Sequence, residues 1–218
     1  KDVHVTVVGL GYVGLPLAIL TASKGMKTYG LDISKERVDK LRKGESYVDD
    51  VSNKELSAAV ESGTFEPTTD AAVIVKSQVI ALCVPTPLTR HKEPDTSYIE
   101  AAGKTVAEKL KKGSLVVLES TTYPGTTQEV LLPILEEYSG LKAGEDFFLA
   151  FAPERVDPGN EQFHFYQVPK VVGGLNPEHT EVAVSFYSHL LDSVYPVSST
   201  QVAEMTKLLE NIYRLVNI

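Results

Sequence analysis

The first turn of the chain carries three glycines at a spacing that suits phosphate binding. Gly9, Gly11 and Gly14 form a G-x-G-x-x-G pattern directly after the apolar run Val3–Val8 and directly before a helical pattern. In such a turn the first glycine allows a tight bend, the second lets a pyrophosphate approach the backbone, and the third lets the helix pack on the strand. Free N–H groups and the positive end of the helix dipole then face the phosphates. The predicted binding turn comprises Gly9, Gly11, Tyr12, Val13 and Gly14.

A carboxylate follows at the distance that a dinucleotide site requires. Asp32 ends the run that starts at Lys27, and it lies 18 residues beyond Gly14. An acid in this place accepts both ribose hydroxyls of NAD and repels the additional phosphate of NADP. Lys35 and Arg37 are close enough to weaken this preference, and Arg37 is an expected cofactor contact. The alternative is a glycine turn that only solves packing, with Asp32 as a helix cap; the strand–turn–helix context favours NAD.

Two polar loops and one polar helix face add further candidates. Thr86 lies between Pro85 and Pro87, which fix an extended loop behind a strand, at the edge where open α/β sheets bind ligands. Without other information, Thr86 is equally well explained as a turn residue with a capping hydroxyl. Thr121 follows another strand at the same edge, and its neighbours Ser120 and Thr122 make that assignment uncertain by one position.

The polar helix face lies near the end of the chain. Lys207, Asn211 and Arg214 share one face of a predicted helix. The same helix carries a broad apolar surface formed by Val202, Met205, Leu208, Leu209 and Ile212. Spacing alone therefore favours an ordinary solvated face over a functional one.

The elements that must position these residues alternate along the chain. Short β-branched runs alternate with longer helical patterns, which is typical of βαβ units and a parallel sheet. The runs are apolar throughout, as expected for strands covered on both faces. The expected strands are Val3–Val8, Lys27–Leu31, Val79–Val84, Leu115–Leu118, Phe147–Phe151 and Lys170–Val172, with a further short one at Ser193–Tyr195. The sequence predicts an α/β fold of the Rossmann type, with a doubly wound, mostly parallel sheet, over residues 1–198.

Helix starts are indicated by three Ser/Thr-x-x-Glu capping boxes. These pair Ser52 with Glu55, Ser97 with Glu100, and Thr126 with Glu129. Further helices are expected over Val13–Ser23, Lys35–Lys43, Glu178–Leu191 and from Gln201 onward. The chain ends inside this last pattern, so the sequence looks cut within a helix. The loop-rich residues 152–169 are the expected cover of a ligand.

Composition excludes several functions. The net charge of -8 disfavours a nucleic-acid partner. Apolar runs fall short of the roughly 18 residues that cross a bilayer, and no export signal is evident. The single cysteine, Cys83, cannot form an internal disulfide, fits a cytoplasmic location, and lies in an apolar run where we expect it to be core. No metal is expected, because metal-ligand spacing is lacking among His4, His91, His164, His179 and His189.

Five motifs in order resemble one enzyme family over the whole chain. They are GLGYVGLP from Gly9, CVPTP from Cys83, ESTTYPGT from Glu119, APER from Ala152 and EMTKLLEN from Glu204. Together they resemble the UDP-glucose/GDP-mannose dehydrogenase family, whose members oxidise the 6-hydroxymethyl group of a nucleotide sugar to a carboxylate with two NAD in succession. Family members are about twice as long and carry a catalytic cysteine on a later loop. The resemblance implies that this chain is an N-terminal half, inactive by itself, and that residues 199–218 begin the long central helix of a second, truncated domain. The whole protein would act on a UDP-sugar and would be homo-oligomeric through that central helix.

The resemblance also assigns roles to individual residues. It implies that Pro85, Thr86 and Thr121 contact the cofactor, and that Thr121 supplies an active-site hydroxyl. Lys207 and Asn211 would stabilise negative charge developing on the substrate oxygen, and Glu154 would orient water or manage a proton. The implied catalytic residues are Thr121, Glu154, Lys207 and Asn211. The implied substrate-binding residues are Glu154, Arg155, Lys207, Asn211 and Arg214.

The loop after Glu154 favours one branch of the family. UDP-glucose enzymes usually read Pro-Glu-Phe-Leu with a further acid soon afterwards, whereas this chain reads PERVDPG from Pro153. This reading resembles the branch acting on UDP-N-acetylhexosamines. Arg155 would donate as a fork to a phosphate or sugar oxygen, or else form a surface ion pair with Asp157 or Glu161. The near alternative is a UDP-glucose 6-dehydrogenase. More distant alternatives are a β-hydroxyacid dehydrogenase of the 6-phosphogluconate type, which also has a Lys-x-x-x-Asn helix, and a non-catalytic dinucleotide sensor.

Overall fold

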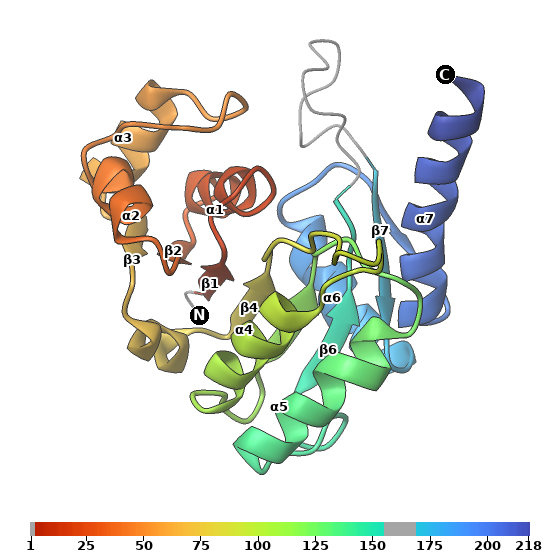
Figure 1. Ribbon diagram of the computed structural model, residues 1–218. Helices are drawn as coiled ribbons and strands as arrows, with labels where there is room; N and C mark the ends of the chain where they lie inside the picture. Colours follow the sequence, from red (N-terminus) through yellow and green to blue (C-terminus); the bar gives the residue numbers. More distant parts are fainter. Residues whose placement is uncertain (1–2, 155–168) are drawn as a thin grey trace.

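The computed structural model describes residues 3–154 and 169–218, which contain one eight-stranded sheet in the order β3-β2-β1-β4-β5-β6-β7-β8 (Figure 1). Only β6 and β7 pair antiparallel; the other neighbouring strands are parallel. The first six strands follow the 3-2-1-4-5-6 order of doubly wound dinucleotide-binding folds. The strands are β1 (His4–Val8), β2 (Lys27–Leu31), β3 (Phe65–Thr68), β4 (Val79–Leu82), β5 (Leu115–Leu118), β6 (Phe148–Phe151), β7 (Lys170–Gly174) and β8 (Val194–Pro196).

Helices cover both faces of the sheet. Alternate residues of β4 enter different apolar clusters, Val79 and Ala81 on one face and Ile80 and Leu82 on the other. The first cluster packs under α1, α2, α3 and α6, and the second under α4, α5 and α7. The helices are α1 (Gly14–Ser23), α2 (Lys35–Arg42), α3 (Asn53–Glu61), the 3₁₀ helix η1 (Ala71–Lys76), α4 (Ser97–Ala107), the π-helix η2 (Thr127–Leu131) running into α5 (Leu132–Ser139), α6 (Pro177–Ser188) and α7 (Thr200–Asn217). The predicted α/β class is confirmed.

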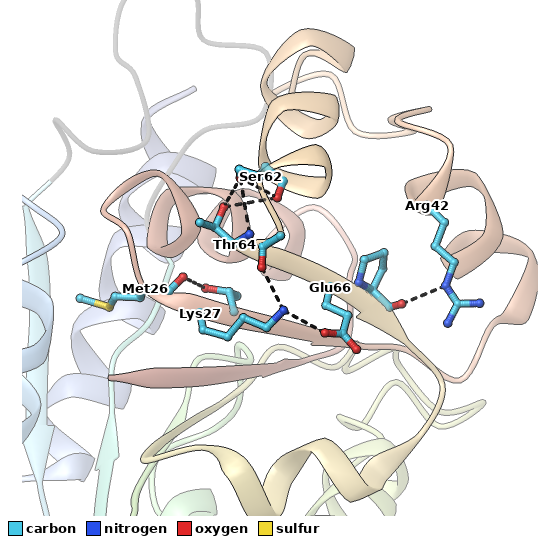
Figure 2. A network of polar contacts seen from close by, with 10 residues as sticks. Met26, Lys27, Arg42, Ser62, Thr64 and Glu66 are labelled. Carbon is cyan, nitrogen blue, oxygen red and sulfur yellow. Dashed lines mark hydrogen bonds and ion pairs between the residues drawn. The ribbon is translucent and has the colours of Figure 1, made fainter. Parts of the chain in front are cut away.

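Most predicted elements lie within two residues of their observed bounds, but β3 was missed. Its sequence, Phe65-Glu66-Pro67-Thr68, breaks the apolar pattern of a buried strand. Proline is tolerated there because β3 is an edge strand, paired only with β2 within the described residues. Figure 2 shows the polar contacts that hold it. Lys27 Nζ of β2 lies 2.9 Å from Glu66 Oε2, and Arg42 Nε donates to the Pro67 carbonyl at 3.2 Å.

Of the three predicted capping boxes, one is confirmed. Ser52 and Glu55 form both reciprocal bonds at the start of α3. The Ser97–Glu100 box is wrong, because Ser97 is already the first helical residue of α4. The preceding Thr96 hydroxyl contacts Glu100 instead, at 2.8 Å, and Asp95 accepts the Ser97 N–H at 3.0 Å.

The Thr126–Glu129 box is also wrong. Thr126 has helical backbone angles, and its hydroxyl donates to the Tyr123 carbonyl at 2.7 Å. The N–H groups at this helix start are bound by Glu204, a residue of α7. The helix α6 ends at Ser188, three residues before the predicted end. No described helix is long and apolar enough to span a membrane.

Candidate active site

The glycine turn lies at the carboxyl ends of β1 and β4, the two paired strands between which the strand order reverses. Gly9 has φ +90°, and a Cβ atom there would lie 2.8 Å from the Cys83 carbonyl oxygen. A Cβ atom on Gly14 would lie 1.8 Å from the Gly9 carbonyl oxygen. Both glycines are therefore required by the backbone itself, which brings the start of α1 close to the ends of both strands.

Gly11 differs from its two neighbours in the motif. A Cβ atom on Gly11 would meet no described atom within 4 Å, so packing within the described chain does not require glycine here. No described side chain caps the start of α1, and its first turn has no acidic residue. The structure therefore leaves open space in front of an uncapped helix start, and this fits the pyrophosphate of a dinucleotide.

We expect Gly11→Ala to weaken NAD binding while leaving the stability of the fold almost unchanged. The added methyl group enters the space that a pyrophosphate would use and touches no described protein atom. Gly14→Ala is the contrasting variant, since its methyl group would clash with backbone and should lower the melting temperature strongly. Calorimetric NAD titration and thermal unfolding of both variants test this, and unchanged NAD affinity in Gly11→Ala would contradict it.

Asp32 is preorganised at the carboxyl end of β2. It is buried, and its carboxylate accepts the Leu10 N–H at 2.9 Å and the Ser34 N–H at 2.8 Å. Arg37 Nη1 lies 3.7 Å from the same carboxylate. The N-cap of α2 is Ser34, so the alternative assignment of Asp32 as the helix cap is wrong. Asp32 instead ties the glycine turn to the end of β2.

Tyr47 also contacts the glycine turn, and the sequence analysis did not predict this contact. Its hydroxyl donates to the Leu10 carbonyl at 2.7 Å, and the Arg37 guanidinium lies 5.6 Å from its ring centroid. Burial, reinforced by the nearby Asp32 carboxylate, raises the pKa of Tyr47 to about 12. The phenol therefore stays neutral and remains a donor to the turn. No local motif marks Tyr47, because it reaches the turn from 37 residues away.

The loops after β4 and β5 meet at the same sheet edge. The Thr86 hydroxyl donates to the Thr121 carbonyl at 2.5 Å, which joins the two candidate cofactor loops. Ser120 is buried and donates to the Val84 carbonyl at 2.7 Å, and Thr122 is also buried. Thr121 is the exposed residue of the three. Exposure thus favours Thr121 as the hydroxyl available to a ligand, and its chemical role stays a prediction, as do those of Pro85 and Thr86.

A buried charged network lies behind this edge. Glu119 directly follows β5, and its carboxylate lies 2.6 Å from Lys170 Nζ of β7; it also accepts the Tyr187 hydroxyl of α6. Lys170 Nζ lies 3.4 Å from Glu154 Oε2. Burial alone would lower the pKa of Lys170, but the Glu119 and Glu154 carboxylates together raise it above the ordinary lysine value. Lys170 therefore stays charged and anchors Glu154 beside the sheet edge.

Cys83 is buried next to this network. Burial, with a smaller contribution from the Glu119 carboxylate, raises the pKa of the Cys83 thiol well above its usual value. A neutral, enclosed thiol is a poor nucleophile, so the interpretation of Cys83 as a core residue is confirmed. Among residues 3–154 and 169–218, no cluster of three or more His, Cys, Asp or Glu side chains is arranged to hold a metal ion.

The remaining candidates lie on and before α7. Lys207 and Arg214 are half-buried and Asn211 is exposed on this helix, which rises along β7 in Figure 1. Their spacing places all three on one face, and their roles stay predictions. Arg155 lies outside the described residues, and so do Asp157 and Glu161, its alternative ion-pair partners.

The sheet order, the glycine turn at its reversal point and the acid ending β2 together define a Rossmann-type dinucleotide-binding domain. Residues 3–191 match the model of the UDP-glucose/GDP-mannose dehydrogenase family, NAD binding domain. The chain therefore belongs to the UDP-glucose/GDP-mannose dehydrogenase family, and its cofactor is NAD. The resemblance drawn from the five motifs is confirmed.

The similar proteins include enzymes named for N-acetylated sugars and one named for UDP-glucose. The chain is 40% identical to UDP-N-acetyl-D-glucosamine 6-dehydrogenase of Pseudomonas aeruginosa, over 100% of this chain and 51% of the relative. A solved UDP-D-ManNAc dehydrogenase of Pyrococcus horikoshii superposes with a TM-score of 0.92 at 37% identity, covering 99% of this chain and 51% of that chain. A UDP-glucose dehydrogenase of Pyrobaculum islandicum gives 0.86 at 25% identity, covering 98% and 50%. The chain spans about half the length of the curated relatives it matches.

Proposed function

We propose that this chain is the NAD-binding half of a nucleotide-sugar 6-dehydrogenase that oxidises the 6-hydroxymethyl group of a UDP-N-acetylhexosamine to a carboxylate. The observation that carries the proposal is the gradient of similarity. Solved structures of UDP-D-ManNAc and NDP-N-acetyl-D-galactosaminuronic acid dehydrogenases are 37% and 38% identical, against 25% for the UDP-glucose enzyme. Bound NAD supplies the hydride acceptor, and two NAD are consumed per sugar.

The residues at the sheet edge and on α7 would have different roles, some in binding NAD and others in binding and oxidising the substrate. We assign the following residues to holding NAD: Gly9, Gly11, Tyr12, Val13, Gly14, Asp32, Arg37, Pro85, Thr86 and Thr121. The exposed Thr121 hydroxyl, the Lys207 ammonium and the Asn211 amide would surround the substrate oxygen and stabilise negative charge developing there. Glu154 would hold water or a proton, and its anchoring by Lys170 supports this role. Arg155 and Arg214 are assigned to the substrate.

We further propose that residues 1–198 form the NAD-binding domain and that residues 199–218 begin the central helix of a second domain. The second half of α7 supports this, since it presents large apolar side chains to solvent, among them Leu209, Ile212, Leu215 and Val216. A central helix of this kind would join two copies into a homo-oligomer. The protein would work in the cytoplasm, where the reduced state of the single, buried Cys83 is maintained.

Assaying NADH release from the full-length protein with three sugars tests the proposal. UDP-N-acetylglucosamine or its manno epimer should give a kcat/KM roughly 10- to 100-fold above that of UDP-glucose. The reason is that a site shaped for the acetamido group leaves buried polar groups unpaired when a hydroxyl replaces it. A clear preference for UDP-glucose would overturn the substrate assignment.

The same assay separates the other classes of protein. This chain alone should bind NAD without net NADH production, because the family's catalytic cysteine lies on a later loop. NAD binding with no sugar oxidation, even in the full-length protein, would support a dinucleotide sensor. Oxidation of a β-hydroxyacid instead of a nucleotide sugar would support the 6-phosphogluconate type.

A further inference from the structure

Glu204 is a buried carboxylate that joins two distant parts of the chain. It lies on α7 and is fully buried. Its carboxylate accepts the Gly125 N–H at 2.6 Å, the Thr127 N–H at 2.9 Å and the Thr127 hydroxyl at 2.6 Å. These donors lie at the start of η2, which runs into α5 and whose own N-cap residue makes no side-chain capping bond. An acid of one helix thus caps the start of another.

Glu204 belongs to the same face of α7 as the proposed active-site residues. Gln201, Glu204, Lys207 and Asn211 are spaced by three, three and four residues, so they form one stripe. At the lower end of this stripe, the Gln201 amide donates to the Gln128 side chain of η2. The stripe therefore begins against η2 at Gln201 and Glu204, and Lys207 and Asn211 follow about one and two turns beyond Glu204.

The donors that bind Glu204 belong to the loop that carries Thr121. Gly125 and Thr127 follow Thr121 by four and six residues, between β5 and α5. One carboxylate therefore links the loop of the proposed catalytic hydroxyl to the helix of the proposed catalytic ammonium and amide.

Apolar packing by itself does little to prevent α7 from turning about its own axis. Of its 18 residues only Thr200, Ala203 and Glu204 are buried, so the buried side chains near the helix start are small apart from Glu204 itself. Rotation by one residue, about 100° in an α-helix, would turn the whole stripe away. The single buried carboxylate accepts three hydrogen bonds, two of them from the backbone N–H groups of Gly125 and Thr127. These bonds resist the rotation because each is directional.

We propose that Glu204 is a positioning residue, which fixes the rotation of α7 so that Lys207 and Asn211 face the loop of Thr121. The inference rests on the proposed dehydrogenase function. Glu204 itself contacts neither substrate nor cofactor in this scheme, and it acts through the two elements it joins.

Kinetics of Glu204→Gln in the full-length protein test the inference. Glutamine keeps the shape but replaces one acceptor oxygen by a donor N–H₂ group, so one backbone bond is lost. We expect kcat to fall about 10- to 100-fold, the scale of a misplaced catalytic group. The KM for NAD should change by a much smaller factor than kcat, because the glycine turn and Asp32, which hold most of the proposed NAD contacts, are separate from α7. Glu137→Gln, at an exposed acid of α5, is the matched control and should leave kcat unchanged.

A second variant keeps the test decisive if Glu204→Gln fails to fold. Thr127→Val removes the hydroxyl donor and leaves both backbone N–H donors. It should lower kcat by a smaller factor than Glu204→Gln, again with a smaller change in the KM for NAD. A folded Glu204→Gln protein, or failing that a folded Thr127→Val protein, with wild-type kcat would overturn the inference. An inactive wild-type protein would instead count against the proposed function.

Discussion

Replacing Lys170 with methionine is expected to lower the free energy of unfolding by about 3–5 kcal/mol, the usual cost of removing one partner of a buried ion pair. Lys170 and Glu119 are 4% and 1% exposed, and their charged atoms lie 2.6 Å apart. Without the ammonium group, the Glu119 carboxylate remains buried, and among the described residues the Tyr187 hydroxyl is then its one hydrogen-bond partner. The penalty arises because a buried charge left without its counter-charge keeps its full desolvation cost.

Urea unfolding followed by circular dichroism measures this loss. The matched control is Lys142→Met, since Lys142 pairs with Glu136 at a similar distance, 2.8 Å, but on the surface. Water and salt screen that pair, so its removal should hardly move the unfolding midpoint. Adding Glu119→Gln to Lys170→Met should recover part of the stability, because the unpaired carboxylate is then gone. Equal losses of unfolding free energy in Lys170→Met and Lys142→Met would show that the buried ion pair contributes no more to stability than the surface pair.

The second large effect concerns the choice of cofactor. The chain should bind NAD much more tightly than NADP, because the additional phosphate of NADP would face the Asp32 carboxylate. Asp32→Ala should weaken NAD binding through the loss of charge-assisted hydrogen bonds, each contributing about 1.5–3 kcal/mol, or roughly 10- to 150-fold in affinity. Calorimetric titration of this chain with both dinucleotides measures the two effects.

Asp32→Asn separates the charge from the architecture of the turn. Asp32 also accepts the Leu10 and Ser34 N–H groups, so alanine disturbs the glycine turn as well as the ribose contact. Asparagine keeps the size and one acceptor oxygen but removes the negative charge. Asp32→Asn should therefore reduce the difference in affinity between NAD and NADP. Its melting temperature should fall less than that of Asp32→Ala. Equal affinity of the unmodified chain for NAD and NADP would show that Asp32 does not select the cofactor.

The elements that could be predicted are those whose signals are local. The apolar runs of β1, β4 and β5 mark strands covered on both faces, and the glycine turn must follow β1 because only glycine fits where Gly9 and Gly14 lie. The strand β3 could not be predicted in this way. Glu66 and Pro67 are compatible with a strand only because β3 lies at the edge of the sheet, and edge position is a property of the assembled sheet.

Helix capping shows the same division. The Ser52–Glu55 box is confirmed because both residues lie within one turn and need no other partner. The Thr126–Glu129 box has the same pattern and is wrong, because Glu204, 77 residues away from Thr127, binds the N–H groups at that helix start. A local motif forms only where no distant group competes for the same donors.

The sequence alone determined the α/β class, the family, the glycine turn after the first strand and the acid that ends the second, because each depends on residues whose types and spacing already imply it. The tertiary structure alone decides which of three adjacent hydroxyls is exposed, that Tyr47 supports the turn, and that Glu119, Lys170 and Tyr187 form one buried network. Glu119 lies 51 residues from Lys170 and 68 from Tyr187, and no periodicity connects them. They meet because β5, β7 and α6 converge behind one sheet edge, where a charge is stable only when an opposite charge is buried with it.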